Sequence, residues 1–237
     1  MPILILAKKD LGELFGSSIA YVFMSVFLFI SFWLFFSSLW LYGQADTRPY
    51  FGQLPLLFLL LLPAVTMGRW SEEKRLGTHE ILFTLPVGDV SLLLGKWLAT
   101  LVFLGVVLLA TLPMPITLAS LGDLDVGVTI ASYIGAFLMG AAFLAFGLFM
   151  SSLTRNQIVA FLVSVLSLFM LYLLAQPVVT DFLPDRFVPV AQALSFATHF
   201  ESMARGVIDS RDVIYFLGLS GFFLYLNYLS LQGRKWA

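Results

Sequence analysis

The sequence contains no cysteine and only two histidines, and 11% of its 237 residues are charged. The absence of cysteine excludes disulfides, thiolate zinc sites, iron–sulfur clusters and thiol nucleophiles. Soluble domains carry about 25% charged residues, whereas this chain is 60% hydrophobic, so we expect a single domain, residues 1–237, dissolved in the lipid bilayer. A net charge of −1 gives no reason to expect nucleic acid as a partner.

Long uncharged stretches mark the expected membrane spans. A helix needs about 20 apolar residues to cross the hydrocarbon core, and six stretches of that length lack Asp, Glu, Lys and Arg. The second is short and carries Pro55 and Pro63, so we expect residues on its C-terminal side to extend it. The uncharged stretch 187–200 is too short to span, and we expect it to be re-entrant or interfacial. The six expected spans are 14–45, 49–68, 97–122, 126–154, 156–180 and 213–233.

The distribution of Lys and Arg predicts the orientation, because cytoplasmic loops carry an excess of both. Most of them fall on the side of the N-terminus, so both termini are expected in the cytoplasm. That side holds Lys8, Lys9, Arg69, Lys74, Arg75, Lys96, Arg155, Arg234 and Lys235, and the other side holds Arg48, Arg186, Arg205 and Arg211.

The expected spans contain no ionisable Asp, Glu, Lys, Arg or His. Ion-coupled carriers and proton pumps need such groups at membrane depth, so these classes are disfavoured, although a sodium site made of carbonyls and hydroxyls stays open. The two histidines, His79 and His199, lie outside the spans on opposite sides of the membrane, and no HExxH or GxSxG motif is present. We therefore expect no catalytic centre, metal or cofactor in this chain.

One motif superficially resembles a phosphate-binding loop. Gly88, Gly95 and Lys96 have the residue types of GxxxxGK[ST], but the glycines are seven apart where the motif needs five. Trp97 also replaces the hydroxyl that would hold magnesium. We therefore interpret Gly95 and Lys96 as the cytoplasmic mouth of the third span, and ATP binding by this chain is not expected.

Residues 1–18 form a separate element at the N-terminus. Apolar residues from Leu4 to Phe15 recur at helical spacing, and Lys9 and Glu13 form an i,i+4 pair on the opposite side. This pattern predicts an amphipathic helix lying in the cytoplasmic interface, because four charges in hydrocarbon would be costly. The alternative is the frayed start of the first span.

Residues 69–96 form the connection between the second and third spans. The charged run 72–75 continues the second span as a solvated helix, and Gly77 can end that helix in the left-handed conformation.

Thr78 can then cap a second, short helix that has Glu80 in its first turn and that Pro86 closes. The apolar face of this helix would contain Ile81, Leu82 and Leu85. Two readings stay open on these residues, a solubilised loop and a docking helix for a cytoplasmic partner.

Residues 177–212 form the connection between the fifth and sixth spans, on the outer side. Three prolines, Pro177, Pro184 and Pro189, divide it. A helix is expected whose apolar face carries Phe196, Phe200, Met203 and Val207. Glu201 and Arg205 form an i,i+4 pair, Gly206 can stop the helix, and Asp209 or Ser210 can cap the last span. The result is an external helical hairpin, either a lid over an exit path or an ordinary structured loop.

The stretch from Glu73 to Pro86, followed by 95–96, resembles the segment after the second span of ABC-2 type ABC transporter permeases. This resemblance implies that Gly77–Pro86 is a coupling helix seated in a cleft of a separate ATPase subunit, and that residues 1–18 are the elbow helix. Residues 151–157 resemble the second cytoplasmic contact of the family. The residues thereby assigned to ATPase coupling are Glu73, Gly77, Thr78, His79, Glu80, Ile81, Leu85, Pro86, Thr154, Arg155 and Asn156.

Residues 198–216 resemble the GldF branch, the gliding-motility-associated permeases of bacterial inner membranes. That resemblance implies two further partners, a GldA-like ATPase and a membrane-anchored GldG-like protein with a large external domain. The external residues that carry it include His199, Phe200, Glu201, Arg205, Gly206, Asp209, Arg211 and Asp212.

The expected architecture is therefore an all-α integral membrane protein with six spans, an elbow helix, a coupling helix and an external hairpin. The expected function is the transmembrane subunit of an ABC-2 type exporter, with ATP and magnesium bound by the partner ATPase. Six spans make half a typical permease, so a second copy or a homologue is implied. The alternative is a non-transporting membrane scaffold that passes ATPase-driven movement to an external partner.

Overall fold

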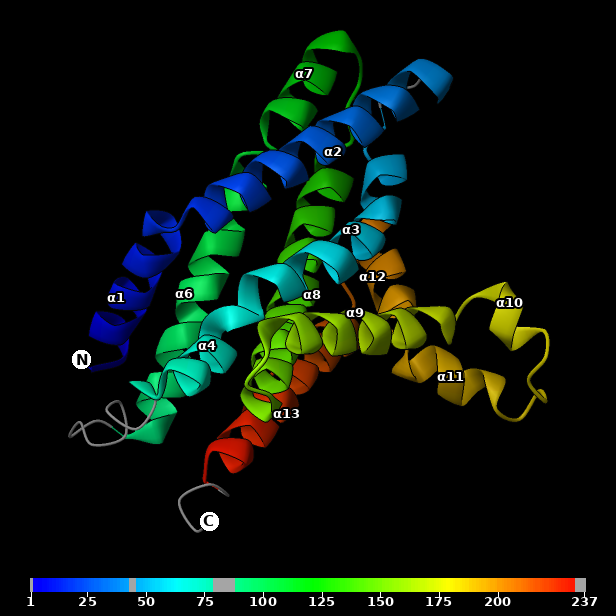
Figure 1. Cartoon of the computed structure of the whole chain (residues 1–237). Coiled ribbons are helices and arrows are strands. Elements are labelled where there is room, and N and C mark those ends of the chain that lie inside the picture. The colour runs from blue at the N-terminus through cyan, green and yellow to red at the C-terminus, as the bar shows by residue number, and fades with distance from the viewer. Residues whose placement is uncertain (1, 43–45, 79–87, 233–237) are drawn as a thin grey trace.

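The computed structural model describes residues 2–42, 46–78 and 88–232, and this part of the chain is helical without strands. Figure 1 shows long helices that run between two ends of the molecule, with α10 and α11 projecting to one side. The helices are α1 (Pro2–Gly16), α2 (Ser18–Tyr42), α3 (Arg48–Thr66), α4 (Gly68–Leu76), α6 (Asp89–Leu109), α7 (Pro113–Leu121), α8 (Val126–Leu153), α9 (Gln157–Leu173), α10 (Pro177–Thr180), α11 (Val188–Leu194), α12 (Phe196–Ala204) and α13 (Ser210–Gln232).

Five segments of the described chain are long and apolar enough to cross a membrane. They are Ser18–Leu41, Arg48–Leu76, Asp89–Leu121, Val126–Leu153 and Ser210–Gln232. These segments confirm five of the expected spans as long apolar helices. The remaining one, expected at 156–180, contains α9, an apolar helix of 17 residues. That length is at the lower limit for a crossing, so the sixth span stays a prediction.

The second span is extended at its C-terminal end, as predicted from its shortness. The helical segment runs from Arg48 to Leu76, 29 residues, because α3 passes into α4 with only Met67 between them. Ser151 of α8 stabilises this junction. Its hydroxyl oxygen accepts hydrogen bonds from the backbone N–H groups of Trp70 and Ser71 at 3.1 and 3.2 Å and donates one to the Met67 carbonyl at 2.7 Å. The charged turn of α4 is thus held against the bundle.

The third span begins earlier than expected and is divided. We expected it at 97–122, but α6 starts at Asp89 and ends at Leu109, and a turn separates it from α7 at Pro113. The break precedes Pro113 because proline removes a helical N–H and clashes with the preceding turn. Thr111 lies in the break, and its hydroxyl donates to the Leu108 carbonyl at 2.6 Å and contacts the Tyr133 hydroxyl at 2.9 Å.

The central helix of the bundle is α8, which contacts α3, α4, α6, α9, α12 and α13. Its glycines allow these close contacts, since small residues let helix backbones approach in a membrane. A Cβ atom at Gly135 would lie 2.8 Å from the Cβ of Met203 on α12, and one at Gly140 would lie 2.5 Å from Leu104 on α6. The neighbouring alanines of α8 are almost fully buried as well.

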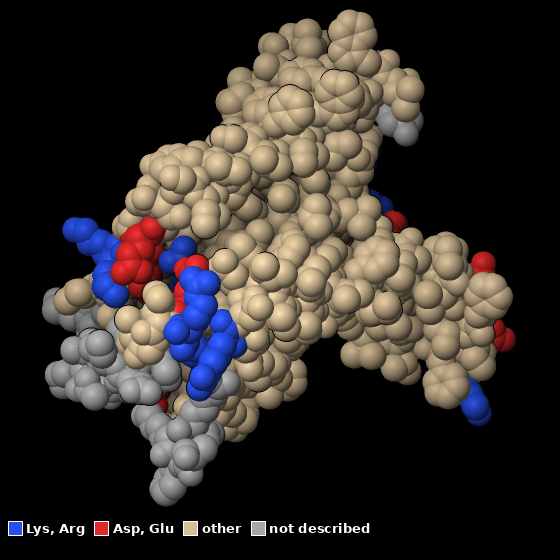
Figure 2. Space-filling model, viewed as in Figure 1, with Lys and Arg blue, Asp and Glu red and all other residues tan. Residues whose placement is uncertain are grey.

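The predicted N-terminal element is a helix distinct from the first span. α1 ends at Gly16 and α2 begins at Ser18, and the Ser17 hydroxyl accepts a hydrogen bond from the Ile19 N–H at 3.2 Å. The predicted pair Lys9–Glu13 is formed at 3.1 Å. α1 packs mainly along α6. Its charged side chains, with those of α4, gather at one end of an otherwise largely uncharged surface (Figure 2).

We predict that Gly135→Ala destabilises the bundle by about 1–3 kcal/mol, because the added methyl group would force α8 and α12 apart at Met203. Gly105→Ala is the control, since its Cβ would meet only one ring carbon of Phe137, at 3.9 Å. Thermal denaturation of both variants in detergent, followed by gel filtration, measures the difference. Equal melting temperatures would show that α12 is not packed against α8 in this way.

Candidate functional site

A buried cluster of charges joins three helices at the charged end of the molecule. The ammonium group of Lys96 on α6 lies 2.5 Å from a Glu73 carboxylate oxygen on α4 and 3.9 Å from an Asp10 carboxylate oxygen on α1. It also lies 4.8 Å from the centre of the Trp70 ring, within the range of a cation–π contact. The side chains of Lys96, Asp10 and Glu73 are 4%, 8% and 19% exposed. A buried ammonium at this position needs both carboxylates to offset its lost hydration.

Gly95 explains how α1 reaches this cluster. A Cβ atom at Gly95 would lie 2.8 Å from the Leu6 Cβ and 3.4 Å from the Ala7 backbone nitrogen. Only glycine permits this approach, which brings Asp10 to Lys96. In the sequence, Gly95 and Lys96 resemble part of a phosphate-binding loop. In the structure, Gly95 packs against α1 and Lys96 pairs with Asp10 of α1.

Lys9 flanks the cluster on the solvent side of α1. Partial burial lowers its pKa, but the hydrogen bond with Glu13 and the carboxylates of Asp10 and Glu73 outweigh that effect and raise the pKa above its ordinary value. Lys9 therefore stays charged, and it adds to the charge balance beside Asp10.

The same end of α4 is attached to α8 and, through α8, to α13. The Lys74 ammonium donates a hydrogen bond to the Ser152 carbonyl. The Ser152 hydroxyl contacts the Ser230 hydroxyl of α13 at 3.1 Å. Together with the Ser151 contacts, these bonds link α4 to two further helices within one turn of α8.

The structure places the first residues of the predicted coupling segment and leaves the rest outside the described part. Gly77 has φ +73°, so the predicted left-handed end of α4 is confirmed. The Thr78 hydroxyl donates to the Glu73 carbonyl at 3.4 Å, back toward α4. Glu73 lies in the charge cluster, a position that its sequence neighbours did not indicate. The residues outside the described range are His79, Glu80, Ile81, Leu85 and Pro86.

The predicted second contact, Thr154–Asn156, is the short linker between α8 and α9. The Asn156 side-chain oxygen accepts a hydrogen bond from the Ile158 N–H at 2.9 Å and so caps α9. The Thr154 hydroxyl oxygen accepts one from the Asn156 N–H at 3.1 Å. Arg155 between them is exposed. This linker is thus fixed in shape while its arginine faces outward.

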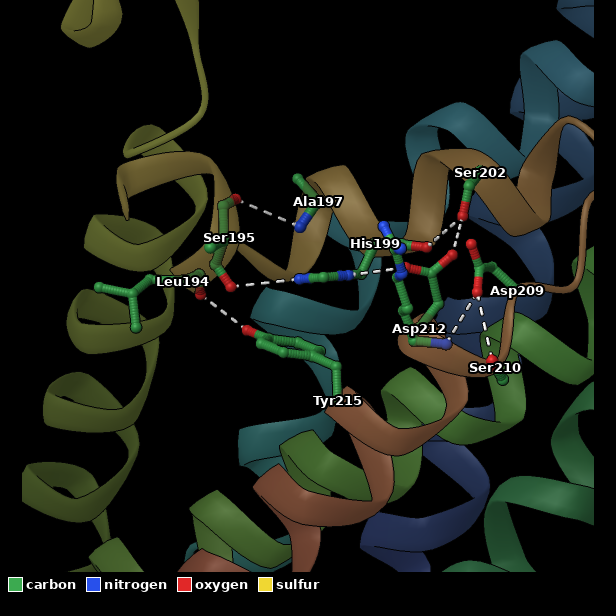
Figure 3. Close-up of polar contacts among 11 residues, drawn as sticks. Leu194, Ser195, Ala197, His199, Ser202, Asp209, Ser210, Asp212 and Tyr215 are labelled. Carbon is green, nitrogen blue, oxygen red and sulfur yellow. Dashed lines mark hydrogen bonds and ion pairs between the residues drawn. The ribbon is translucent and has the colours of Figure 1, made fainter. Parts of the chain in front are cut away.

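A second polar cluster lies in the 177–212 region and ties α11, α12 and α13 together (Figure 3). His199 of α12 contacts the Asp212 carboxylate of α13 at 2.7 Å through Nδ1 and the Ala193 carbonyl of α11 at 3.1 Å through Nε2. Its ring stacks on Tyr215, with centroids 3.9 Å apart, and the Tyr215 hydroxyl donates to the Leu194 carbonyl at 2.7 Å.

The second oxygen of the Asp212 carboxylate accepts a hydrogen bond from the Ser202 hydroxyl of α12. Both oxygens of this carboxylate are thus held by side chains of α12, and the His199 ring also reaches α11. The His199–Asp212 pair therefore links three helices.

Other predictions for this region have mixed outcomes. The Glu201–Arg205 pair is formed at 3.7 Å, Gly206 turns the chain at φ +95°, and Asp209 accepts a hydrogen bond from the Arg211 N–H at 2.9 Å at the start of α13.

One residue of the predicted apolar face is misplaced. Phe196, Phe200 and Met203 are buried as predicted, against neighbours that include α8, but Val207 is exposed. The prediction for Val207 was wrong because α12 ends at Ala204 and Gly206 turns the chain away from the helical repeat. The hairpin is thus partly built into the bundle through α12.

We predict that Lys96→Gln destabilises the fold by about 3–5 kcal/mol, because it leaves two buried carboxylates without a cation. Adding Glu73→Gln to this variant should recover part of the loss. Lys9→Gln, which breaks an exposed pair, should cost under about 1 kcal/mol. Denaturation of the purified variants tests this, and a Lys96→Gln variant as stable as Lys9→Gln would contradict the cluster.

We predict that His199→Phe loosens α11 while it keeps the ring that stacks on Tyr215. Because the chain has no cysteine, Ala191→Cys, which is buried on α11, gives a clean reporter. Loss of two hydrogen bonds should raise its maleimide labelling rate about tenfold or more.

Val190→Cys, exposed on the same helix, is the control and should label rapidly in both backgrounds. Unchanged labelling of Ala191→Cys in the His199→Phe background would show that His199 does not hold α11.

Comparison with known proteins adds a family to this geometry. Comparison with curated proteins finds no match. The sequence profile of the ABC-2 family transporter proteins matches residues 55–231, which run from the middle of α3 almost to the end of α13 and include Glu73, Lys96 and Asp212. The chain therefore belongs to the ABC-2 transporter family, as a multi-pass permease component of an ABC exporter that works with an ATPase subunit.

Proposed function

We propose that this permease couples a substrate path to ATP hydrolysis through the segment that follows α4, Gly77–Pro86. The observation that carries the proposal is the Lys96 cluster, which lies one helical turn before Gly77. A force applied to the segment after Gly77 reaches α4 first. The buried pairs with Lys96 and the contacts with Ser151 then pass that force to α6, α1 and α8. The residues around Gly77 thus have a direct mechanical connection to the spans.

The linker Thr154–Asn156 is proposed as the second contact with the ATPase. It follows α8 directly, and its capped geometry leaves the Arg155 side chain exposed. Ser151 and Ser152, which bind α4, lie within four residues of it. The two proposed contact segments are therefore attached to each other, so one ATPase surface can act on both.

We propose six membrane crossings with both termini in the cytoplasm of a bacterial inner membrane. The first residues of α1 and the last of α13 lie at the same end of the molecule (Figure 1), which supports an even number of crossings. Five crossings would separate the termini, so in this proposal α9 and the residues after it form the sixth. The excess of Lys and Arg on the side of the termini supports the orientation.

The partners proposed for this chain follow from its family and from its resemblance to the GldF branch. They are a cytoplasmic GldA-like ATPase that binds ATP and magnesium, a second permease copy or homologue, and a GldG-like protein with an external domain. The lipid bilayer is proposed as the surrounding solvent, because the long helices expose mainly apolar side chains. Neither ATP nor nucleic acid is proposed as a ligand of this chain.

One observation favours the alternative function, a scaffold that moves an external partner without transport. His199 of α12 joins α11 to α13, and at the other end of α13 Ser230 contacts Ser152 of α8, whose carbonyl binds Lys74 of α4. A movement of α4 could thus reach the projecting α10–α11 arm. Measurement of amphiphile export by the reconstituted complex separates the alternatives, because a scaffold would hydrolyse ATP without moving any solute.

We predict that Gly77→Pro and Glu80→Lys each uncouple the ATPase without preventing membrane insertion. Proline cannot adopt the positive φ of Gly77. Lysine near the start of the proposed helix loses a dipole interaction of about 0.3–1 kcal/mol and reverses its sign. Each variant is co-expressed with the cognate ATPase, and complex recovery and ATP hydrolysis are measured.

Asp123→Lys is the matched control, with the same change of charge at an exposed position before α8. It should assemble and hydrolyse ATP like the unmodified protein. If Gly77→Pro and Glu80→Lys also do so, the segment 77–86 is a plain loop and the coupling proposal fails.

A further inference from the structure

A pocket of about 460 Å³ lies between α2 and the α3–α4 helix, beside the charge cluster. One half of the pocket is apolar and is lined by Phe23 and Val26 of α2 and by Leu61 and Val65 of α3. Its other half is polar and includes Arg69, Lys96 and carboxylates of α1 and α4. Neither the mechanical role of the Lys96 cluster nor the proposed coupling segment uses this space.

The shape of the pocket suits a molecule with one apolar and one polar end. The lining residues on α3 and α4 run from Leu61 to Leu76, which is about 22 Å of helix. Along this length the lining passes from aliphatic and aromatic side chains to the charged end of the molecule seen in Figure 2. The pocket therefore crosses the level at which hydrocarbon gives way to polar surroundings.

Arg69 distinguishes the polar half of the pocket. No hydrogen bond or salt bridge joins it to a residue in the described ranges, but its charge interacts with the carboxylates of Asp10, Glu13, Glu72 and Glu73. The carboxylates that share this lining do have cationic partners, as three ion pairs show. Glu13 pairs with Lys9 at 3.1 Å, Glu72 with Arg75 at 3.9 Å and Glu73 with Lys96 at 2.5 Å. The N–H donors of the Arg69 guanidinium, which lines the polar half of the pocket, thus have no hydrogen-bond acceptor among the described residues.

The pocket is too small to enclose a helix from a second copy or another protein. A helix is about 10–12 Å across with its side chains, so two turns occupy on the order of 900 Å³, well above 460 Å³. An extended acyl chain is much thinner. Val22 and Val26 on the α2 wall are 61% and 41% exposed, so an occupant can enter from the surrounding bilayer.

We propose that this pocket binds a phosphate-headed amphiphile from the leaflet nearer the charge cluster. The acyl chain lies along Phe23, Val26 and Leu61, and the phosphate binds Arg69, whose planar fork matches phosphate oxygens. The amide of Gln157 at the start of α9 also lines the polar half and offers a further donor. This site goes beyond ATPase coupling and does not require the partner ATPase, so its failure would leave the coupling proposal intact.

Photolabelling tests the site directly. The full chain is placed in phosphatidylcholine nanodiscs with a trace of phosphatidic acid that carries a diazirine on one acyl chain, and labelled residues are mapped by mass spectrometry. Labels are expected on Phe23, Val26 and Leu61. Arg69→Gln should reduce this labelling about tenfold, since a charge-assisted bond contributes about 1.5–3 kcal/mol. Arg75→Gln, on the same helix but outside the pocket, is the matched control and should label normally.

A second variant keeps the test decisive if Arg69→Gln misfolds. Ala64→Phe fills the apolar half while Arg69 is retained, and it should also suppress labelling. Unlabelled phosphatidic acid should compete, whereas diacylglycerol, which lacks the phosphate, and inorganic phosphate, which lacks the chain, should not.

The inference is overturned by labelling spread evenly along α2, by equal labelling in Arg69→Gln and Arg75→Gln, or by equal competition from diacylglycerol. Cross-links between two copies of the chain at these residues would instead identify the pocket as part of a subunit interface and would also overturn it.

Discussion

Lys96 is the residue on which the charged end of this bundle depends. Its ammonium group is almost wholly buried between Glu73 and Asp10 and lies against Trp70. Taking three charged groups out of water costs several kcal/mol per ion, and good pairing geometry is what offsets that cost. Separation of α1, α4 and α6 would leave an unpaired charge in a dry environment. The three helices are therefore expected to move as one unit, which is a property that an ATPase-driven element needs.

Features that depend on local chemistry could be predicted from the sequence. Unpaired charges are costly in lipid, so the charge-free stretches of the sequence predicted the positions of five long apolar helices. The shortness of the second stretch also predicted the C-terminal extension of the second span. Gly77 and Gly206 end helices at positive φ because few other residues adopt that conformation. Asp209 bonds the backbone at the start of α13 because a short carboxylate reaches an N–H group two residues ahead. Each of these outcomes is decided within a few residues.

Features that depend on how helices rotate against each other could not be predicted. The Lys96–Glu73 pair joins residues 23 positions apart, and Asp10 reaches it only because Gly95 admits α1. The sequence indicated that Gly95 and Lys96 lie at the cytoplasmic mouth of the third span, but not that they contact α1. Periodicity alone placed Val207 on the apolar face, although the helix stop expected at Gly206 precedes it, and the close contact of Gly206 with Val128 of α8 could not be predicted.

The helix α13 carries Asp212 of the second polar cluster at one end, and at its other end it is connected through α8 to α4. At one end Ser230 contacts Ser152, next to the residues that hold α4, and at the other Asp212 binds His199. Between these ends α13 packs along α8, and Phe223 meets Phe146 edge-on at 4.7 Å. A packed helix transmits displacement along its axis with little loss, because close-packed interiors are hardly compressible. Movement at α4 can therefore reach the α11–α12 region through α8 and α13.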